Sequence, residues 1–255
     1  MIYSDPENAM EIAWPLPTDS MALSADKLDV WAVRLDQGCS LSGKLEASLS
    51  TAERQRADRF RLDAPRQRFV VTRAALRMLL GKYLGEAASA VAIDIDPSGK
   101  PCLAAQYRAA ELHFNVAHSG DLAVVAVTAG CEVGVDVERV RPVSHAEHIA
   151  RRYFHPAETQ AILSAAPSER DTVFLRCWTG KEAVLKALGS GVTGPLAAFH
   201  VPTEEFDIAW ITLPSTLSKN QDRCWLHELA PCPGYVGAVA CLGNERLVRP
   251  FTFEL

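Results

Sequence analysis

Two carboxylates two residues apart stand inside an apolar, β-branched stretch, Val133-Gly134-Val135-Asp136-Val137-Glu138. Side chains of a β-strand alternate between its two faces, so we predict that Asp136 and Glu138 share one face and the valines the other. Like charges this close oppose each other's ionisation unless a cation lies between them. Few, hard oxygen ligands suit Mg²⁺, which often shares its coordination shell with substrate phosphates. A solvated sheet edge is the other interpretation of an isolated Asp-x-Glu.

A second group of charged residues follows about forty residues later, within Trp178-Thr179-Gly180-Lys181-Glu182-Ala183-Val184-Leu185-Lys186. Apolar residues recur around it at helical spacing, which predicts a helix with one face in the core. Taken alone, Glu182 and Lys186 are typical of an exposed i,i+4 pair worth about 0.2–0.5 kcal/mol. Gly180 costs a helix interior about 1 kcal/mol relative to alanine, which indicates a packing or ligand-access reason for it.

Composition indicates an ordinary globular protein with one locally basic segment. The 255 residues are 48% hydrophobic and 22% charged, and the net charge of −5 gives no overall attraction to nucleic acid or to an anionic membrane. Residues 53–77 nevertheless hold eight arginines and no lysine. Because the arginine fork suits phosphate, this segment favours a small polyanionic ligand, with a solvated helix face as the alternative.

The seven cysteines are scattered and form no Cys-x-x-Cys pair, so we expect reduced, mostly buried thiols and neither a disulfide framework nor a zinc site. Residues 1–20 lack a basic start followed by an apolar run, and no apolar stretch approaches membrane-spanning length. We therefore expect a cytoplasmic protein without a membrane segment.

The hydrophobic pattern predicts an α+β protein built from two similar α/β halves, residues 1–130 and 131–255. Each half is expected to run strand, helices, closing β-hairpin, and to leave a cleft against the other half in which the active site lies. Strands are expected at 28–35, 91–95, 112–116, 122–127, 133–137, 208–213, 224–229 and 235–242. Helices are expected from a capping box at 50–53 to 81 or 85 with a break at 63–65, at 146–153, from 156, and at 168–188.

The two charged motifs together resemble the paired signatures of the 4'-phosphopantetheinyl transferases, G-[VI]-D-[VI]-E and W-x-x-K-E-[AS]-x-x-K. Three further segments resemble the larger, Sfp-type branch of that family and occur in the same order: Gly99-Lys100-Pro101, Phe114–Gly120 and Pro233–Ala240. The resemblance spans about residues 48 to 242. Each motif is weak alone, and the five in order carry the assignment.

The resemblance implies a fold, a reaction and its partners. It implies an intramolecular pseudo-dimer with coenzyme A and Mg²⁺ between its halves, which makes a monomer the expected state. It implies transfer of the 4'-phosphopantetheine arm of coenzyme A to a serine of an acyl carrier protein or peptidyl carrier protein. Adenosine 3',5'-bisphosphate would be the second product.

The same resemblance assigns roles to the charged residues of the two motifs. Asp136, Glu138 and Glu182 would hold Mg²⁺ against the pyrophosphate of coenzyme A. Glu182 is also the candidate base for the carrier serine, directly or through a water. Lys186 would steady charge on the departing phosphate, and Lys181 would be a second phosphate contact.

Four residues of the first half would bind coenzyme A by the same comparison. His118 matches a family histidine that contacts phosphate, and Lys100 matches a lysine near the adenine and the ribose phosphate. Arg54 and Arg56 are the candidates for the 3'-phosphate.

Two positions depart from the family pattern. Ala117 stands where some relatives carry a ligand-contacting serine, and Glu53 stands where a relative has a basic residue. Both departures concern ligand affinity more than reaction type. For the acidic carrier protein we expect a basic and apolar landing surface at 151–154, Arg-Arg-Tyr-Phe, which an ordinary amphipathic helix end would also explain.

Two other functions remain open on sequence alone. One is another Mg²⁺ enzyme acting on phosphoanhydrides, such as a nucleotidyl transferase or a pyrophosphohydrolase, which needs no carrier protein. The other is a non-catalytic coenzyme A binder, in which replacing Glu182 would leave the cellular role intact.

Overall fold

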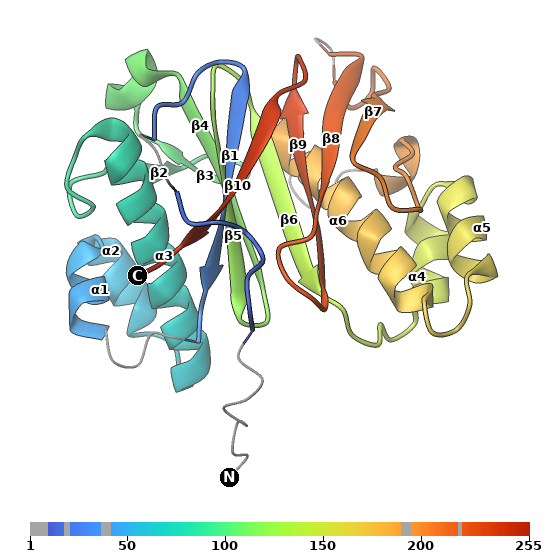
Figure 1. Cartoon of the computed structure of the whole chain (residues 1–255), viewed down its shortest axis with the longest axis horizontal. Helices are drawn as coiled ribbons and strands as arrows, with labels where there is room; N and C mark the ends of the chain where they lie inside the picture. Colours follow the sequence, from blue (N-terminus) through green and yellow to red (C-terminus); the bar gives the residue numbers. More distant parts are fainter. Residues whose placement is uncertain (1–9, 18–20, 37–41, 190–194, 219–220) are drawn as a thin grey trace.

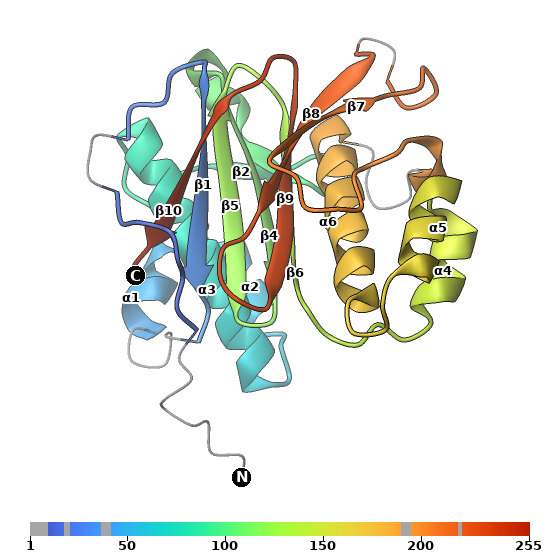
Figure 2. The ribbon, with the colours of Figure 1, turned by 45° about the vertical axis from the view of Figure 1, so that its right-hand side comes forward.

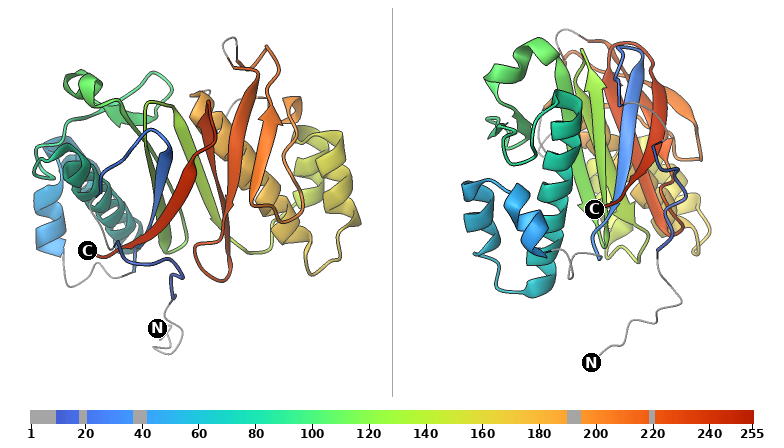
Figure 3. Two further views of the ribbon diagram at one scale, coloured as in Figure 1. Left: turned by 45° about the horizontal axis from the view of Figure 1, so that its top comes forward. Right: turned by 60° about the vertical axis from the view of Figure 1, so that its left-hand side comes forward.

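The computed structural model describes residues 10–17, 21–36, 42–189, 195–218 and 221–255, and these form two four-stranded sheets with helices on their outer sides (Figure 1). The strand order is β10-β1-β5-β4 in the first sheet and β6-β9-β8-β7 in the second. Helix α3 packs on the first sheet, as the right-hand view of Figure 3 shows, and α6 lies along β6 and β9 of the second (Figure 2). The sheet faces turned away from these helices share one buried apolar core.

The elements have the following bounds. In the first half they are β1 Lys27–Arg34, α1 Ser42–Ser48, α2 Thr51–Ala57, α3 Asp63–Leu84, β2 Ile93–Ile95, β3 Pro101–Leu103, the 3₁₀ turn η3 Ala105–Ala110, β4 Leu112–Ser119 and β5 Leu122–Ala129. In the second they are β6 Val133–Arg139, α4 Ala146–Tyr153, α5 Pro156–Ser164, α6 Arg170–Leu188, η4 Leu196–Ala198, β7 Ile208–Thr212, β8 Arg223–Leu229, β9 Tyr235–Leu242 and β10 Leu247–Phe253.

The two halves repeat one topology, which confirms the predicted α+β fold. Strand β1 pairs antiparallel with β5, as β6 pairs with β9. In each half the partner strand closes an antiparallel hairpin, β4–β5 or β8–β9, and a long helix, α3 or α6, lies between the opening strand and that hairpin in the chain. No described helix has both the length and the apolar character needed to cross a bilayer.

The last strand crosses back to the first half. Strand β10 runs parallel to β1, where Arg249 forms two bonds of 2.7 and 3.0 Å with the buried carboxylate of Asp29. Pro250 is tolerated there because β10 is an edge strand and pairs with β1 alone. The division of the chain at residue 130 stays a prediction. Residues 247–253, which this division assigns to the second half, pair with β1 of the first half.

Most predicted elements occur, but several boundaries move: β2 begins at Ile93 instead of residue 91, and β4 and β5 run on to Ser119 and Ala129. The capping box of Ser50 and Glu53 opens α2 as predicted. The helical break lies at 58–62, and Pro65 sits in the first turn of α3, where a missing N–H leaves no helical bond unmade. Glu169, and not Ser168, precedes α6, while Gly189 ends that helix in the left-handed conformation. Short α1 and β3 were not predicted, nor was β10.

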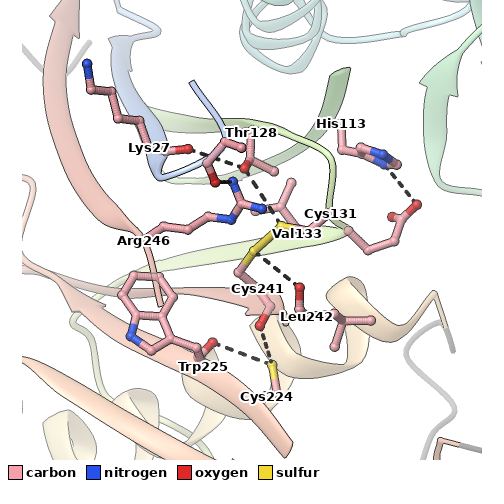
Figure 4. The surroundings of a disulfide bond; sticks show 12 residues. Lys27, His113, Thr128, Cys131, Val133, Cys224, Trp225, Cys241, Leu242 and Arg246 are labelled. Carbon is pink, nitrogen blue, oxygen red and sulfur yellow. Dashed lines mark hydrogen bonds and ion pairs between the residues drawn. A yellow bond between two sulfur atoms is a disulfide. The ribbon is translucent and has the colours of Figure 1, made fainter. Parts of the chain in front are cut away.

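The expectation that every thiol is reduced is wrong for one pair. Cys131, just after β5, and Cys241, near the end of β9, form a disulfide across 110 residues of chain (Figure 4). The β6–β9 pairing places Val133 opposite Cys241, and this brings Cys131 alongside. Cys177 and Cys224 stay free, and burial raises the pKa of each thiol to about 12. Cys39 lies outside the described residues.

Gly134 allows α6 to touch the backbone of β6. A Cβ atom at this position would lie 2.1 Å from the carbonyl oxygen of Ala183 and 2.4 Å from the backbone nitrogen of Ala187. Both neighbours are helix backbone and cannot turn aside as a side chain could. Glycine is therefore required here for α6 to lie directly on the strand.

We expect Gly134→Ala to destabilise the protein by about 3 kcal/mol, because the added methyl must push α6 away from β6. Gly180→Ala is the matched control: its Cβ would meet Leu226 and Val201 at 3.5 Å, an ordinary contact, and should add up to about 1 kcal/mol of helix propensity. Urea unfolding of both variants gives the comparison. A Gly134→Ala protein as stable as the unsubstituted one would contradict this account.

Candidate active site

Strand β6 and helix α6 bring together two acids, Asp136 and Glu182, and one base, Lys186. Asp136 and Glu182 are 8% and 4% exposed, although both are carboxylates. One helical turn after Glu182, the amino group of Lys186 lies 2.7 Å from Asp136 Oδ1 and donates to the carbonyl of Val135 at 3.1 Å. Two motifs far apart in sequence thus meet at one place.

The buried carboxylates have unused hydrogen-bonding capacity. Asp136 Oδ2 and Glu182 Oε1 are buried and have no hydrogen-bond partner. Burial raises the pKa of both carboxyls; Glu138 raises both further, Asp136 also raises that of Glu182, and Lys186 opposes these effects. Ionised carboxylates in such a place destabilise the fold unless a positive charge compensates them.

These features suit a cation that shares its ligands with a bound molecule. The orphaned oxygens are hard donors of the kind that Mg²⁺ prefers. Within the described ranges, however, no group of three or more His, Cys, Asp or Glu side chains is arranged to hold a metal ion unaided. A cation here would need oxygens from elsewhere, as Mg²⁺ usually does with phosphate substrates.

The end of β4 and the turn after it, both in the first half, reach the acids of the second half. Ser119 Oγ donates to Glu138 Oε2 at 2.6 Å. Next to it, partial burial lowers the pKa of His118, and the positive charges of Lys186 and Arg68 lower it further while Glu138 opposes them. Arg68 pairs with Asp121 of the same turn at 2.7 Å. Sequence reasoning did not single out Arg68, because its contact with the turn exists only in the fold.

Side chains, and not a neighbouring strand, satisfy the outer edge of β6. This strand pairs with β9 on one side and ends the second sheet on the other. Four backbone groups of its outer edge bond to side chains: Val133 O with Lys100 Nζ at 3.1 Å, Val135 N–H with Asn115 Oδ1 at 2.9 Å, Val135 O with Lys186 Nζ, and Arg139 N–H with Ser119 Oγ at 3.1 Å. The first half thereby fixes the strand that carries the acids.

Lys100 ties the β2–β3 loop to the second half. Its amino group contacts Glu132 Oε2 at 3.2 Å and the carbonyl of Lys186 at 3.1 Å, besides that of Val133. It also lines a cavity of about 530 Å³, which holds none of the three acids of the motifs. Its predicted contact with adenine and ribose phosphate stays a prediction.

Comparison with known proteins agrees with this arrangement. Residues 132–240 match the model of the 4'-phosphopantetheinyl transferase superfamily, and residues 42–130 match that of a 4'-phosphopantetheinyl transferase N-terminal domain. The chain is 36% identical to the 4'-phosphopantetheinyl transferase HetI of Nostoc sp. over 92% of its own length and 95% of that protein. It is 30% identical to the 4'-phosphopantetheinyl transferase Sfp of Bacillus subtilis over 68% of its own length and 77% of that protein.

The chain belongs to the 4'-phosphopantetheinyl transferase family. Its two domains and its similarity over most of the chain place it with the Sfp-type members. It is therefore an enzyme that transfers 4'-phosphopantetheine to carrier proteins.

The structure corrects the role predicted for Lys181 in this transferase. The side chain is fully buried on the other side of α6, 2.9 Å from the equally buried carboxylate of Glu158. It donates to the carbonyls of Leu196 and Phe199, each at 2.7 Å, and lies over the Phe199 ring. Lys181 therefore joins α6 to α5 and to residues 196–199, which follow α6, and its amino group is enclosed by these partners instead of facing the acids of the site.

The predicted arginines of the transferase are not brought to the acids. Arg54 donates to the carbonyl of Leu49, and Arg56 lies over the Phe69 ring; both are exposed. In the described part of the chain, neither one forms a hydrogen bond or an ion pair with Asp136, Glu138 or Glu182. Their binding to a 3'-phosphate remains a prediction.

The unusual acid at position 53 has a structural explanation. Glu53 is buried on α2 and pairs with Arg73 at 2.9 Å and Arg77 at 2.6 Å, both on α3. Arg77 also donates to the carbonyls of Ala88 and Val91. Part of the arginine-rich segment therefore serves helix packing and not a ligand.

We expect Lys181→Met to lose about 3–5 kcal/mol of stability, because Glu158 would be left charged and buried without its partner. Adding Glu158→Gln in the same chain should recover part of that loss, since no buried charge then remains. Chemical denaturation of the two variants measures this. If Lys181→Met kept full stability and merely bound coenzyme A more weakly, the structural role would be refuted.

Proposed function

We propose that this transferase uses coenzyme A as donor and a serine of an acyl or peptidyl carrier protein as acceptor, with Mg²⁺, and releases adenosine 3',5'-bisphosphate. The observation that carries the proposal is the pair of buried, unpartnered oxygens on Asp136 and Glu182, beside the amino group of Lys186. Opposite charges held at one place suit a reaction that breaks a pyrophosphate.

Asp136, Glu138 and Glu182 are the residues that we propose to hold a divalent cation, together with oxygens of the bound donor, because among the described residues the three acids alone do not form a complete metal site. When bound, the cation would neutralise charge on the pyrophosphate. The raised pKa values of Asp136 and Glu182 support this, because such carboxyls gain most from a nearby positive charge.

Glu182 is the proposed base for the carrier serine. Its Oε1 is buried and has no hydrogen-bond partner, so this oxygen has a lone pair with which to accept the proton of the serine hydroxyl. Lys186 is the proposed partner of the departing phosphate, because its charge already stands at the acidic group. The two side chains lie one helical turn apart, so one rigid element positions both.

The proposed coenzyme A contacts come from the first half. His118 stands at the end of β4, within the electrostatic reach of Lys186 and Glu138, and is the best placed of them for a phosphate. Lys100 lies at the cavity beside η3 and is proposed for the nucleotide end. Arg54 and Arg56 remain proposals for the 3'-phosphate, although Arg68 stands nearer the β4–β5 turn.

The carrier protein is proposed to land near the end of α4. Arg151, Arg152 and Tyr153 are exposed there, and Tyr153 shows 46% of its surface. The prediction is wrong for Phe154, which is buried against Phe174 and belongs to the core. A basic surface with an exposed aromatic ring suits an acidic partner. A cytoplasmic, monomeric enzyme remains our expectation.

Incubation with coenzyme A, Mg²⁺ and a panel of apo carrier proteins tests the proposal by mass spectrometry. We expect a carrier to gain the mass of phosphopantetheine, and Glu182→Gln to slow that transfer by about 10²–10⁴-fold while the protein stays folded. Glu205→Gln, at a glutamate whose side chain is 88% exposed, serves as the control with unchanged rate. Cleavage of coenzyme A without any carrier, or full activity of Glu182→Gln, would count against it.

A further inference from the structure

One hydroxyl of the first half holds an acid of the second. Ser119 ends β4, and its Oγ donates to Glu138 Oε2 at 2.6 Å while accepting the backbone N–H of Arg139 at 3.1 Å. Both partners are neighbours on β6. Among the described residues, this is the one hydrogen bond from the first half to the carboxylates of Asp136, Glu138 or Glu182.

The two bonds of Ser119 fix the direction of its proton. A serine hydroxyl has a single hydrogen and can otherwise rotate freely. Because the Arg139 N–H takes a lone pair, the hydrogen is left for the carboxylate of Glu138. Hydrogen bonds from a hydroxyl to an ionised oxygen are short and strong, and the 2.6 Å separation agrees with that.

The other partner of Glu138 is a poor anchor. The guanidinium of Arg141 stays 3.6 Å away, and 55% of that side chain is exposed. Asp136, in contrast, is held by Lys186, and Glu182 is confined by the buried face of α6. Without Ser119, the carboxylate of Glu138 would be free to turn on its strand.

We propose that Ser119 is a positioning residue that aims Glu138 at the divalent cation. The inference rests on the proposed function, since it requires a cation at this site. Hydrogen-bond partners of metal-binding carboxylates govern metal affinity, and their loss commonly weakens it about 10–100-fold. Through Ser119, the end of β4 that carries His118 would also set the geometry of β6, so the two halves would bind the donor and the cation jointly.

The first test compares Ser119→Ala with Ser119→Thr, which keeps the hydroxyl. We expect the alanine variant to need about 10-fold more Mg²⁺ for half-maximal transfer, with kcat at saturating Mg²⁺ nearly unchanged. The threonine variant should return to within about 3-fold of the unsubstituted protein. Ser164→Ala, which removes a surface hydroxyl that pairs with Gln160 on α5, is the control and should change nothing.

A binding measurement without turnover accompanies it. Electron paramagnetic resonance measures the concentration of free Mn²⁺ in the presence of coenzyme A and without a carrier. From it we expect the dissociation constant of Mn²⁺ to be about 10-fold higher for Ser119→Ala than for the unsubstituted protein. If that variant loses stability or rate while Mg²⁺ half-saturation and Mn²⁺ binding stay unchanged, Ser119 is merely structural and the inference is overturned.

A double-mutant cycle with Glu138→Gln separates the two proposals. If Ser119 acts through Glu138, Ser119→Ala should have little further effect on Mn²⁺ binding once Glu138 is replaced. Additive effects would overturn the inference alone. If Glu138→Gln itself leaves both transfer and Mn²⁺ binding unchanged, the proposed metal site fails, whatever Ser119 does.

Discussion

The direct contact between α6 and β6 at Gly134 is the constraint on which the site depends. With hydrogen as its side chain, this residue lets the helix backbone lie against the strand, and Glu182 and Lys186 then reach the level of Asp136. A larger residue would separate the helix from the strand, and Glu182 from Asp136 and Glu138. The chemistry therefore rests on a close approach of backbones before any charged residue contributes.

The same contact creates an electrostatic burden. Carboxylates from two elements are gathered in a buried place, and a single lysine compensates them in part. Structural packing alone would favour apolar residues there. Elsewhere the fold balances its buried charges, as in the fully enclosed Lys181–Glu158 pair with its backbone partners. The carboxylates of Asp136 and Glu182 are thus the buried charges that a bound cation would compensate. Functional sites often keep such destabilising groups because activity requires them.

Sequence periodicity predicted what local spacing determines. Alternation on β6 set Asp136 apart from the valines, and the i,i+4 interval placed Glu182 above Lys186 on α6. Periodicity could not predict contacts between elements that are distant in sequence. Lys181 stands next to Glu182 in the motif, yet it pairs with Glu158 of another helix. The disulfide, the return of β10 and the Ser119–Glu138 bond likewise depend on strand pairing or on packing between halves. Family resemblance supplied roles that neither spacing nor propensity could.

A crystal structure with coenzyme A and Mn²⁺, read by anomalous diffraction at the manganese edge, tests the central claim most directly. The account predicts one strong Mn²⁺ peak within coordination distance of carboxylate oxygens from both Asp136 and Glu182, with a phosphate oxygen of the donor beside it. A Mn²⁺ ion bound elsewhere, or apolar side chains of α6 lying between those two carboxylates, would contradict it.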